Sequence, residues 1–414
     1  MAVEHSHKGV KTLILFFIER TLFVCSIMLH RIACELLVAG LFLACGLTDQ
    51  TPTQSPTLTP PGPQLLANRL AYYPRTLHLQ HQPAGKDRLL TSFDTDKNRA
   101  ALFESLDDGQ TWQPVAEVVD TTAKWHCCSG LWEMPQPLGR FATGTLFWSP
   151  SMGCPRDPRC QAAITIHRSA DGGRTWQPHS TLVTGNVGLW EPEFIVDAKG
   201  QLVAYYSTEE HRGDGFNQLL AHKVSTDGGL TWGSEIRDVA LPDQPDKKMR
   251  PGMAIVRQLP NKSFAMVYEI CGMGCDVYIR FSKDGLAWGS PTDPGTRLES
   301  AKGQHFAHAP SFTVAPDGSL LVVGQLVVDG AGKVTSDNGR VILVNRTGGT
   351  GLWTQQPAPV PVPEAYDNPC PNYSSQLLVL PTNKTLLEVA LKPDDGMCKP
   401  YVATSALPDD FFTR

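Results

Sequence analysis

Three glutamates stand in apolar stretches of this chain. Glu191 and Glu193 lie in "LWEPEF", and Glu269 closes "AMVYE". Residues two apart on a strand face the same side, so Glu191 and Glu193 are expected to point together. Two carboxylates held that close repel each other, which raises the pKa of one. A pair of carboxyl groups facing one pocket can hydrolyse a glycosidic bond, one protonating the leaving oxygen while the other attacks or activates water.

Further side chains beside these glutamates suit sugar binding. Arg250, in "MRPGM", opens a strand, and Tyr268 and Glu269 end the next one. Trp190 precedes Glu191, and Glu133 follows "GLW" in a similar context. The competing interpretation is structural: a Glu at a strand end is usually a solvated charge, and a Trp usually packs in the core.

A repeated motif indicates the elements that must position these residues. "SLDDGQTW", "SADGGRTW", "STDGGLTW" and the shortened "SKDGLAW" begin at 105, 169, 225 and 282, at intervals of 64, 56 and 57. A period of this size is typical of solenoids and propellers. In the motif, Asp can bond backbone N–H groups of its own turn and Gly permits positive φ. The motif therefore predicts a structural hairpin turn, looser in the last copy, which lacks one residue and the Thr.

The segments between the motifs alternate apolar and polar residues, as strands do. About 350 residues follow Pro63, and a repeat of about 58 gives six units. The sequence therefore predicts an all-β fold, a six-bladed β-propeller with four-stranded antiparallel blades. The blades are expected at 75–119, about 131–183, 189–239, 250 to about 290, from 308 with a degenerate turn at 346–353, and from 372 onward. The sixth is one strand short, and 66–73 is expected to complete it and close the ring.

The four motifs resemble the Asp-boxes of the sialidase superfamily. "LWEPEF" followed by "RPGM", "LPN" and "MVYE" is similar to family 93 of the glycoside hydrolases, the exo-acting α-L-arabinanases. That resemblance implies release of arabinobiose from linear α-1,5-arabinan with retention. It also implies Glu191 as acid/base and Glu269 as nucleophile, with Glu193 as the alternative for the first role.

The sialidases themselves are the nearest alternative. Their arginine clamp, acid and tyrosine nucleophile would correspond to Arg75 and Arg250, Asp94, and Tyr373. The third arginine is missing, because "HFAHAP" places His305 and His308 there. Losing one bidentate charge-assisted pair weakens a carboxylate clamp. A neutral sugar is therefore the expected substrate, with Arg75, Arg250, His308 and Tyr373 binding hydroxyl groups. A non-catalytic carbohydrate-binding propeller is the third hypothesis.

The N-terminal region is typical of targeting sequences. "LLVAGLFLAC" at 36–45 is a short apolar run after His30 and Arg31, which predicts a signal segment over 1–45 with a true start at Met28. Cys45 resembles a lipidation site, so we expect a secreted protein with a possible lipid tether; plain cleavage or a retained helical anchor are the alternatives. Residues 46–65 are rich in Pro and Thr and are expected to form a linker before the propeller at 66–414.

Eight of the eleven cysteines follow the targeting region, an even number that suggests disulfides in an exported chain. The spacings favour Cys154–Cys160, Cys271–Cys275 and Cys370–Cys398. Zinc is the competing interpretation for "CGMGC", but no second pair stands nearby, so no metal or cofactor is expected. The net charge is −5 with no Lys/Arg run, which argues against nucleic acid. The expected partner is a polysaccharide or oligosaccharide, bound by a monomer.

Overall fold

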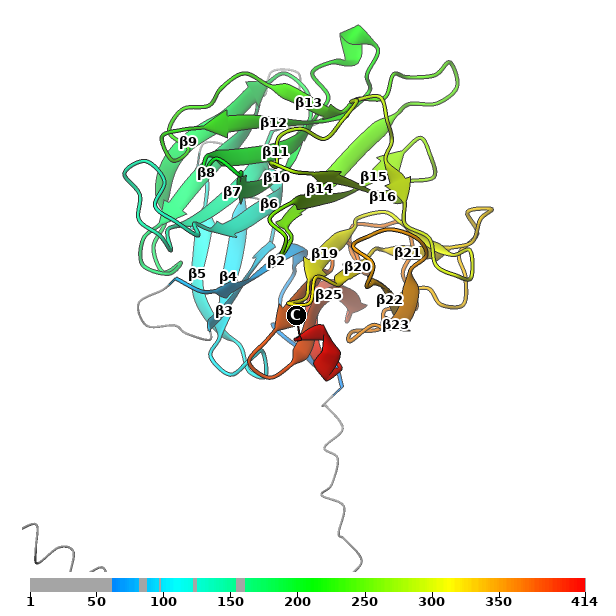
Figure 1. Cartoon of the computed structure of the whole chain (residues 1–414). Coiled ribbons are helices and arrows are strands. Elements are labelled where there is room, and N and C mark those ends of the chain that lie inside the picture. Colours follow the sequence, from blue (N-terminus) through cyan, green and yellow to red (C-terminus); the bar gives the residue numbers. More distant parts are fainter. Residues whose placement is uncertain (1–61, 82–87, 97, 122–124, 154–160, 414) are drawn as a thin grey trace, which may run out of the picture. The chain divides into compact units, whose positions relative to one another are not determined.

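Six antiparallel sheets make up the part of the chain that the computed structural model describes, residues 62–81, 88–96, 98–121, 125–153 and 161–413. The first strands of successive sheets are neighbours in the order β2, β6, β10, β14, β19, β24 and back to β2. The sheets therefore form a closed ring, a six-bladed β-propeller, as predicted (Figure 1).

Each of the first three blades is a meander of four strands. Blade one holds β2 (Tyr72–Leu79), β3 (Arg88–Asp94), β4 (Arg99–Ser105) and β5 (Gln113–Val119). Blade two holds β6 (His126–Glu133), β7 (Leu146–Met152), β8 (Ala162–Ser169) and β9 (Gln177–Gly185). Blade three holds β10 (Leu189–Val196), β11 (Leu202–Thr208), β12 (Leu219–Ser225) and β13 (Ile236–Val239).

Blade four is larger than expected, and blades five and six each have four strands. Blade four holds β14 (Arg250–Gln258), β15 (Phe264–Cys271), β16 (Asp276–Ser282) and β17 (Thr296–Arg297), extended by β18 (His305–Ala307) and β21 (Leu326–Val328). Blade five holds β19 (Ser311–Val314), β20 (Leu320–Val323), β22 (Val341–Asn345) and β23 (Thr354–Pro357). Blade six holds β24 (Gln376–Leu380), β25 (Thr385–Asp394), β26 (Met397–Ala406) and β1 (Gln64–Leu65).

The N-terminal end of the described chain completes blade six. β1 pairs antiparallel with β26, Gln64 opposite Val402 and Leu65 opposite Tyr401. The expected segment, 66–73, continues along the same edge, where Leu66 N donates to Pro400 O at 2.9 Å, and Tyr72 then begins β2. The ring is thus closed by strands from opposite ends of the sequence.

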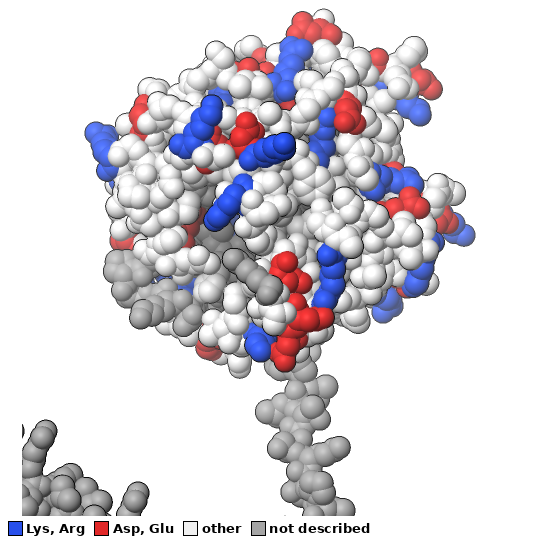
Figure 2. Space-filling model, viewed as in Figure 1, with Lys and Arg blue, Asp and Glu red and all other residues white. Residues whose placement is uncertain are grey.

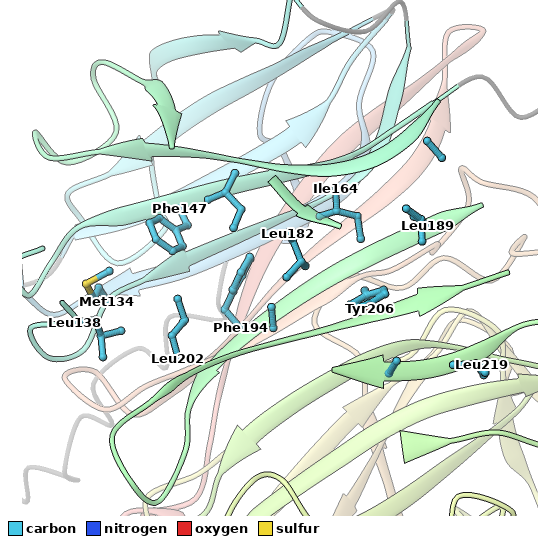
Figure 3. Close-up of a cluster of buried hydrophobic side chains, with 14 of the residues drawn as sticks. Met134, Leu138, Phe147, Ile164, Leu182, Leu189, Phe194, Leu202, Tyr206 and Leu219 are labelled. Carbon is cyan, nitrogen blue, oxygen red and sulfur yellow. The ribbon is translucent and has the colours of Figure 1, made fainter. Parts of the chain in front are cut away.

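Apolar side chains between adjacent blades form the core. One cluster fills the space between blades two and three and includes Phe147, Ile164, Phe194 and Tyr206, all almost completely buried (Figure 3). The described helices are two single 3₁₀ turns, η1 (Arg212–Asp214) and η2 (Asp409–Phe411). Neither has the length or apolar character needed to cross a membrane.

The repeated motif forms the predicted hairpin turns. In blade three, Asp227 accepts hydrogen bonds from the N–H and hydroxyl of Thr231 at 3.0 and 2.6 Å, while Ser225 Oγ accepts from Gly229 N at 2.8 Å. Although partial burial opposes it, this hydrogen bonding lowers the pKa of Asp227 to about 2. Gly229 has φ of 86°, the left-handed region that favours glycine. The copy in blade four keeps two N–H bonds to Asp284 but, having Ala287 in place of Thr, lacks the hydroxyl bond.

Candidate active site

The innermost strands of blades one to four each carry a β-bulge at the same place. The register shifts after Tyr72, Cys127, Trp190 and Gly252. The residue after each shift has a left-handed backbone conformation: Tyr73 (φ 51°), Cys128 (58°), Glu191 (60°) and Met253 (55°). In blades five and six, left-handed residues also precede the first strand: His308, Ala309, Asn372 and Ser374. Bulges re-aim side chains and are frequent beside active sites, so these positions define one end of the propeller centre as the candidate site.

Glu191 is the bulge residue of blade three, and its carboxylate is tied to blade four. Its Oε2 accepts hydrogen bonds from Ser207 Oγ and from the backbone N of Met253, both at 2.8 Å. Its own backbone N donates to Ser151 Oγ in blade two at 3.0 Å. Glu191 thereby links three blades, while no described residue donates to its Oε1.

Glu269 lies beside the bulge of blade four, the bulge whose Met253 binds Glu191. It stands opposite Gly252 on the neighbouring strand, and Gly252 directly precedes the Met253 that binds Glu191. Glu269 Oε2 accepts from the backbone N of Ala309, in the chain before blade five, at 2.6 Å. The two glutamates, 78 positions apart in the sequence, are therefore brought together by one bulge.

Electrostatics distinguish the two carboxyl groups. Burial raises the pKa of Glu269 to about 8; one backbone hydrogen bond and Arg250 oppose this effect, and the negative charge of Glu191 adds to it. Burial also raises the pKa of Glu191, but two hydrogen bonds and the nearby Arg250 and Arg75 oppose it. Glu269 therefore keeps its proton to a higher pH than an ordinary glutamate does.

Glu193 lies apart from this pair, contrary to the expectation that it would point with Glu191. The bulge between Trp190 and Glu193 breaks the strict alternation of the strand. Glu193 is 7% exposed and forms an ion pair with Arg257 on β14, whereas the Glu191 carboxylate accepts from Ser207 and Met253. Its environment is that of a structural salt bridge.

Arg250 and Trp190 lie beside the glutamates and share a partner. Glu209 Oε1 accepts from Arg250 at 2.8 Å and from the Trp190 indole N–H at 3.3 Å. Arg250 also donates to Gln218 Oε1 at 2.6 Å. The Arg250 side chain is 37% exposed, so a fixed guanidinium with remaining donors meets solvent next to the carboxylates.

Three residues expected to bind hydroxyl groups surround the pair, with different exposure. Arg75 is 5% exposed; it stacks 3.9 Å from the Tyr73 ring centre and donates to Ser374 Oγ at 2.8 Å. Tyr373 is half-buried, and its hydroxyl lies 3.5 Å from Met253 Sδ. His308 is half-buried beside Asp367, at 3.9 Å, and burial lowers the pKa of its imidazole.

The residues expected from the sialidase arrangement lie in buried environments. Burial, reinforced by Glu269 and Glu191, raises the pKa of Tyr373 well above its ordinary value. Asp94 is 3% exposed and accepts from Ser129 N and Oγ at 3.1 and 2.5 Å, so it anchors the bulge of blade two.

Two expected binding residues lie elsewhere. Tyr268 is fully buried and donates to Pro294 O at 2.7 Å, because neighbours on a strand face opposite sides and Glu269 takes the site-facing position. Glu133 ends β6, five residues beyond Cys128, where it accepts from the backbone N of Gln80 and His81. Both interactions are structural.

The sequence reasoning missed Ser207, Met253 and Ala309, two of which act through backbone N–H groups that no motif reveals. Ser207 had a weak signal, a small polar residue in the apolar strand "LVAYYST". It stands opposite Trp190, as Ser151 stands opposite Cys127, Asp94 opposite Tyr72 and Glu269 opposite Gly252. These four equivalent positions form a polar ring around the bulges.

Two predicted disulfides are confirmed, Cys271–Cys275 and Cys370–Cys398. Cys154 and Cys160 lie outside the described residues. The adjacent Cys127 and Cys128 are bonded to each other, which was not predicted. One ring nitrogen of His308 and the sulfurs of Cys271 and Cys275 lie within 4.8 Å of one another, but the sulfurs are committed to their disulfide.

Fold and site together define the class: a six-bladed β-propeller with a carboxylate pair at one end of its centre. The structure is similar to the α-L-arabinanase of Penicillium chrysogenum complexed with arabinobiose (23% identity; 84% of this chain and 98% of that chain; TM-score 0.68). It is also similar to Fusarium graminearum α-L-arabinofuranosidase with an iminosugar inhibitor (22%; 84% and 98%; 0.66) and to the GH93 α-L-arabinofuranosidase of that fungus with arabinobiose (23%; 83% and 95%; 0.64). No protein-family model and no curated protein sequence matches the chain.

Proposed function

We propose that this protein is a glycoside hydrolase that acts on arabinan, releasing a short product from the chain end with retention of configuration. The observation that carries the proposal is the placement of Glu191 and Glu269 on either side of the Gly252–Met253 bulge. The similarity to propellers whose complexes hold arabinobiose supports the choice of sugar. The face of the propeller seen in Figure 2 carries interspersed charges of both signs.

The two environments suggest which carboxyl group does what. An acid catalyst must hold a proton before the reaction, and the pKa of about 8 gives that property to Glu269. A nucleophile must be ionised; burial raises the pKa of Glu191, but two hydrogen-bond donors and two nearby arginines oppose this effect and favour its charged form. We therefore assign Glu269 as acid/base and Glu191 as nucleophile, the reverse of the roles that the resemblance implied.

In the first step, Glu269 transfers its proton to the glycosidic oxygen as the bond from that oxygen to the anomeric carbon breaks. Glu191 Oε1, which accepts no hydrogen bond from described residues, attacks the anomeric carbon and forms an ester. In the second step, Glu269 removes a proton from water, and the oxygen of that water displaces Glu191 from the sugar. One water is consumed, and both carboxyl groups return to their starting states.

Arg250 is the best candidate for binding a sugar hydroxyl. Glu209 and Gln218, both less than 8% exposed, fix its guanidinium, so little side-chain entropy is lost when it donates to a substrate. Trp190 is held by the same Glu209 and makes an edge-to-face contact with Trp125, 6.2 Å between ring centres. We propose that the two form the polar and apolar sides of one sugar position.

The test is hydrolysis of linear arabinan with analysis of the products, followed by rescue of variants with azide. Glu191→Ala and Glu269→Ala should each lose at least about 10³-fold in kcat. With an aryl arabinoside whose leaving group needs no protonation, azide should rescue Glu269→Ala and yield a glycosyl azide of retained configuration. Azide should yield the inverted product with Glu191→Ala, because it then replaces the nucleophile.

Glu193→Gln is the matched control, since it removes a neighbouring carboxylate that is engaged by Arg257. It should keep arabinan hydrolysis within a few-fold of the parent. Exchanged azide outcomes would reverse the assigned roles. Binding of arabinan without turnover would replace the hydrolase with a carbohydrate-binding propeller, and cleavage of a sialoside instead would replace the substrate.

We also propose that the protein is exported. The described cysteines form disulfides, which persist in oxidising compartments. Fractionation of the producing cells, with the protein found outside the cytoplasm, is the corresponding test.

A further inference from the structure

The Cys127–Cys128 disulfide occupies the bulge of blade two. Cys128 has φ of 58° and stands at the register position that Glu191 holds in blade three and Met253 in blade four. The disulfide therefore belongs to the same ring of residues as the proposed nucleophile. Both cysteines are partly exposed, so the bridge is not simply a core element.

The bridge adjoins the apolar residues that surround the two glutamates. Cys128 packs against a small buried cluster that contains Tyr73, Met253 and Ala309, together with the half-buried Tyr373. Met253 and Ala309 are the residues whose backbone N–H groups bind Glu191 and Glu269, respectively. A line of contacts thus runs from the disulfide to both carboxylates.

The surrounding structure fixes the disulfide in place. Ser129, the next residue, donates from its N–H and its hydroxyl to the buried Asp94 of blade one. His126, which precedes Cys127, is 4% exposed, and its Nε2 lies 3.3 Å from the Asp94 carboxylate. Asp94 thus contacts the residues on both sides of the disulfide. Cys128 itself has a positive φ, a conformation that residues other than glycine rarely adopt.

Stabilisation of the fold does not account for this bridge. A disulfide stabilises a fold mainly by restricting the unfolded chain, an effect that grows with the length of the closed loop, and two adjacent residues close almost none. Cys370–Cys398 spans 28 positions and fits that role instead. What the adjacent pair does provide is a rigid, apolar and polarizable surface among polar side chains.

A sugar ring requires such a surface. Its hydroxyl groups need donors and acceptors, which the carboxylates and Arg250 supply, while its C–H face is apolar and gains from dispersion contacts. Resting on the proposed function, we propose that the Cys127–Cys128 disulfide contacts substrate directly, as the surface against which the C–H face of the sugar held by Glu191 and Glu269 packs.

The experiment compares three full-length proteins: the wild type, Cys127→Ser/Cys128→Ser, and the control Cys370→Ser/Cys398→Ser. Arabinobiose binding is measured by calorimetry, hydrolysis of arabino-oligosaccharides by steady-state kinetics, and unfolding by the Tm. The first double variant should weaken arabinobiose binding and raise KM about tenfold, with kcat changed less than threefold. The control should lower Tm while leaving KM and arabinobiose affinity unchanged.

Labelling tests the same contact in the unaltered sequence, whether or not the variant folds. After mild reduction of the native protein, arabinobiose should slow alkylation of Cys127 and Cys128, as followed by mass spectrometry, but not that of Cys370. Unchanged affinity in the first double variant, or alkylation insensitive to arabinobiose, would overturn the inference while leaving the hydrolase proposal intact. A wild type that neither binds nor cleaves arabino-oligosaccharides would overturn both.

Discussion

Replacing Glu269 by Gln should stabilise the protein while abolishing its activity. In the folded protein the pKa of Glu269 is about 8, against an ordinary value of 4.5, because the carboxyl group is buried near Glu191. Between these two pH values the unfolded chain is ionised at this residue while the folded chain keeps its proton. Unfolding therefore releases a proton, and the free energy of unfolding falls as pH rises. Gln resembles the protonated acid and escapes this loss.

The size of the effect follows from the two pKa values. Each unit corresponds to about 1.4 kcal/mol, so the 3.5 units between 4.5 and 8 set an upper limit of about 5 kcal/mol. Although burial of the carboxyl group raises its pKa, the Glu269 residue as a whole keeps some exposure; solvent screening therefore reduces the effect, and we expect about half of that limit. The advantage of the variant should be near zero at pH 4, grow as pH rises, and level off above pH 8.

The assay is urea-induced unfolding of the wild type and Glu269→Gln at pH 4, 6 and 9. Glu193→Gln is the control, with the opposite sign expected, because it breaks the ion pair with Arg257 and should destabilise the protein at pH 6 and 9. A Glu269→Gln variant with the same pH dependence as the wild type would refute the reasoning. It would show that Glu269 ionises normally and is not the proton donor.

Three further results are expected from the same contacts. Ser207→Ala removes a hydrogen bond to the Glu191 carboxylate worth about 1.5 kcal/mol, so the pKa of Glu191 should rise by about one unit. In the pH profile of kcat/KM, the acid limb should shift up by the same amount while the alkaline limb stays unchanged. Asp227→Ala should cost about 1 kcal/mol at pH 6, a difference that disappears as pH falls from about 4 to 2, and Asp284→Ala should cost less because its turn lacks the Thr hydroxyl. Gly130→Ala would place a Cβ 2.4 Å from Pro192 O, between Glu191 and Glu193; kcat/KM should fall at least tenfold, whereas Gly213→Ala, in open space, should change nothing measurable.

The architecture was predictable because it depends on period and on local turn chemistry. The Ser, Asp and Gly of each repeat interact within four residues, so their spacing in the sequence survives in the structure. The degenerate copy in blade five shows the same rule with other residues, since Asn345 Oδ1 accepts from Gly349 N at 2.7 Å, as Ser225 Oγ accepts from Gly229 N.

The site was only partly predictable because strand alternation fails at the bulges. A regular strand would put Glu191 and Glu193 on one face, but one extra residue in the register separates them. Where alternation holds, as on β15, neighbouring residues face opposite sides. Tyr268 therefore faces the core while Glu269 faces the site, and the prediction that both bind substrate was wrong for Tyr268. The bond between Cys127 and Cys128 depends on the left-handed turn at the bulge, which no spacing rule for cysteines reveals.

The pairing of β1 with β26 has a consequence for how the molecule is made. A ribosome delivers Gln64–Leu65 long before it delivers Met397–Ala406, so β1 has no partner while the strands between them are made. Five sheets can assemble in order during that time, but the sixth cannot be completed until Met397–Ala406 has been made. Until then β1 and the outer edge of β25 lack their partner β26, and these free edges can pair with a neighbouring chain.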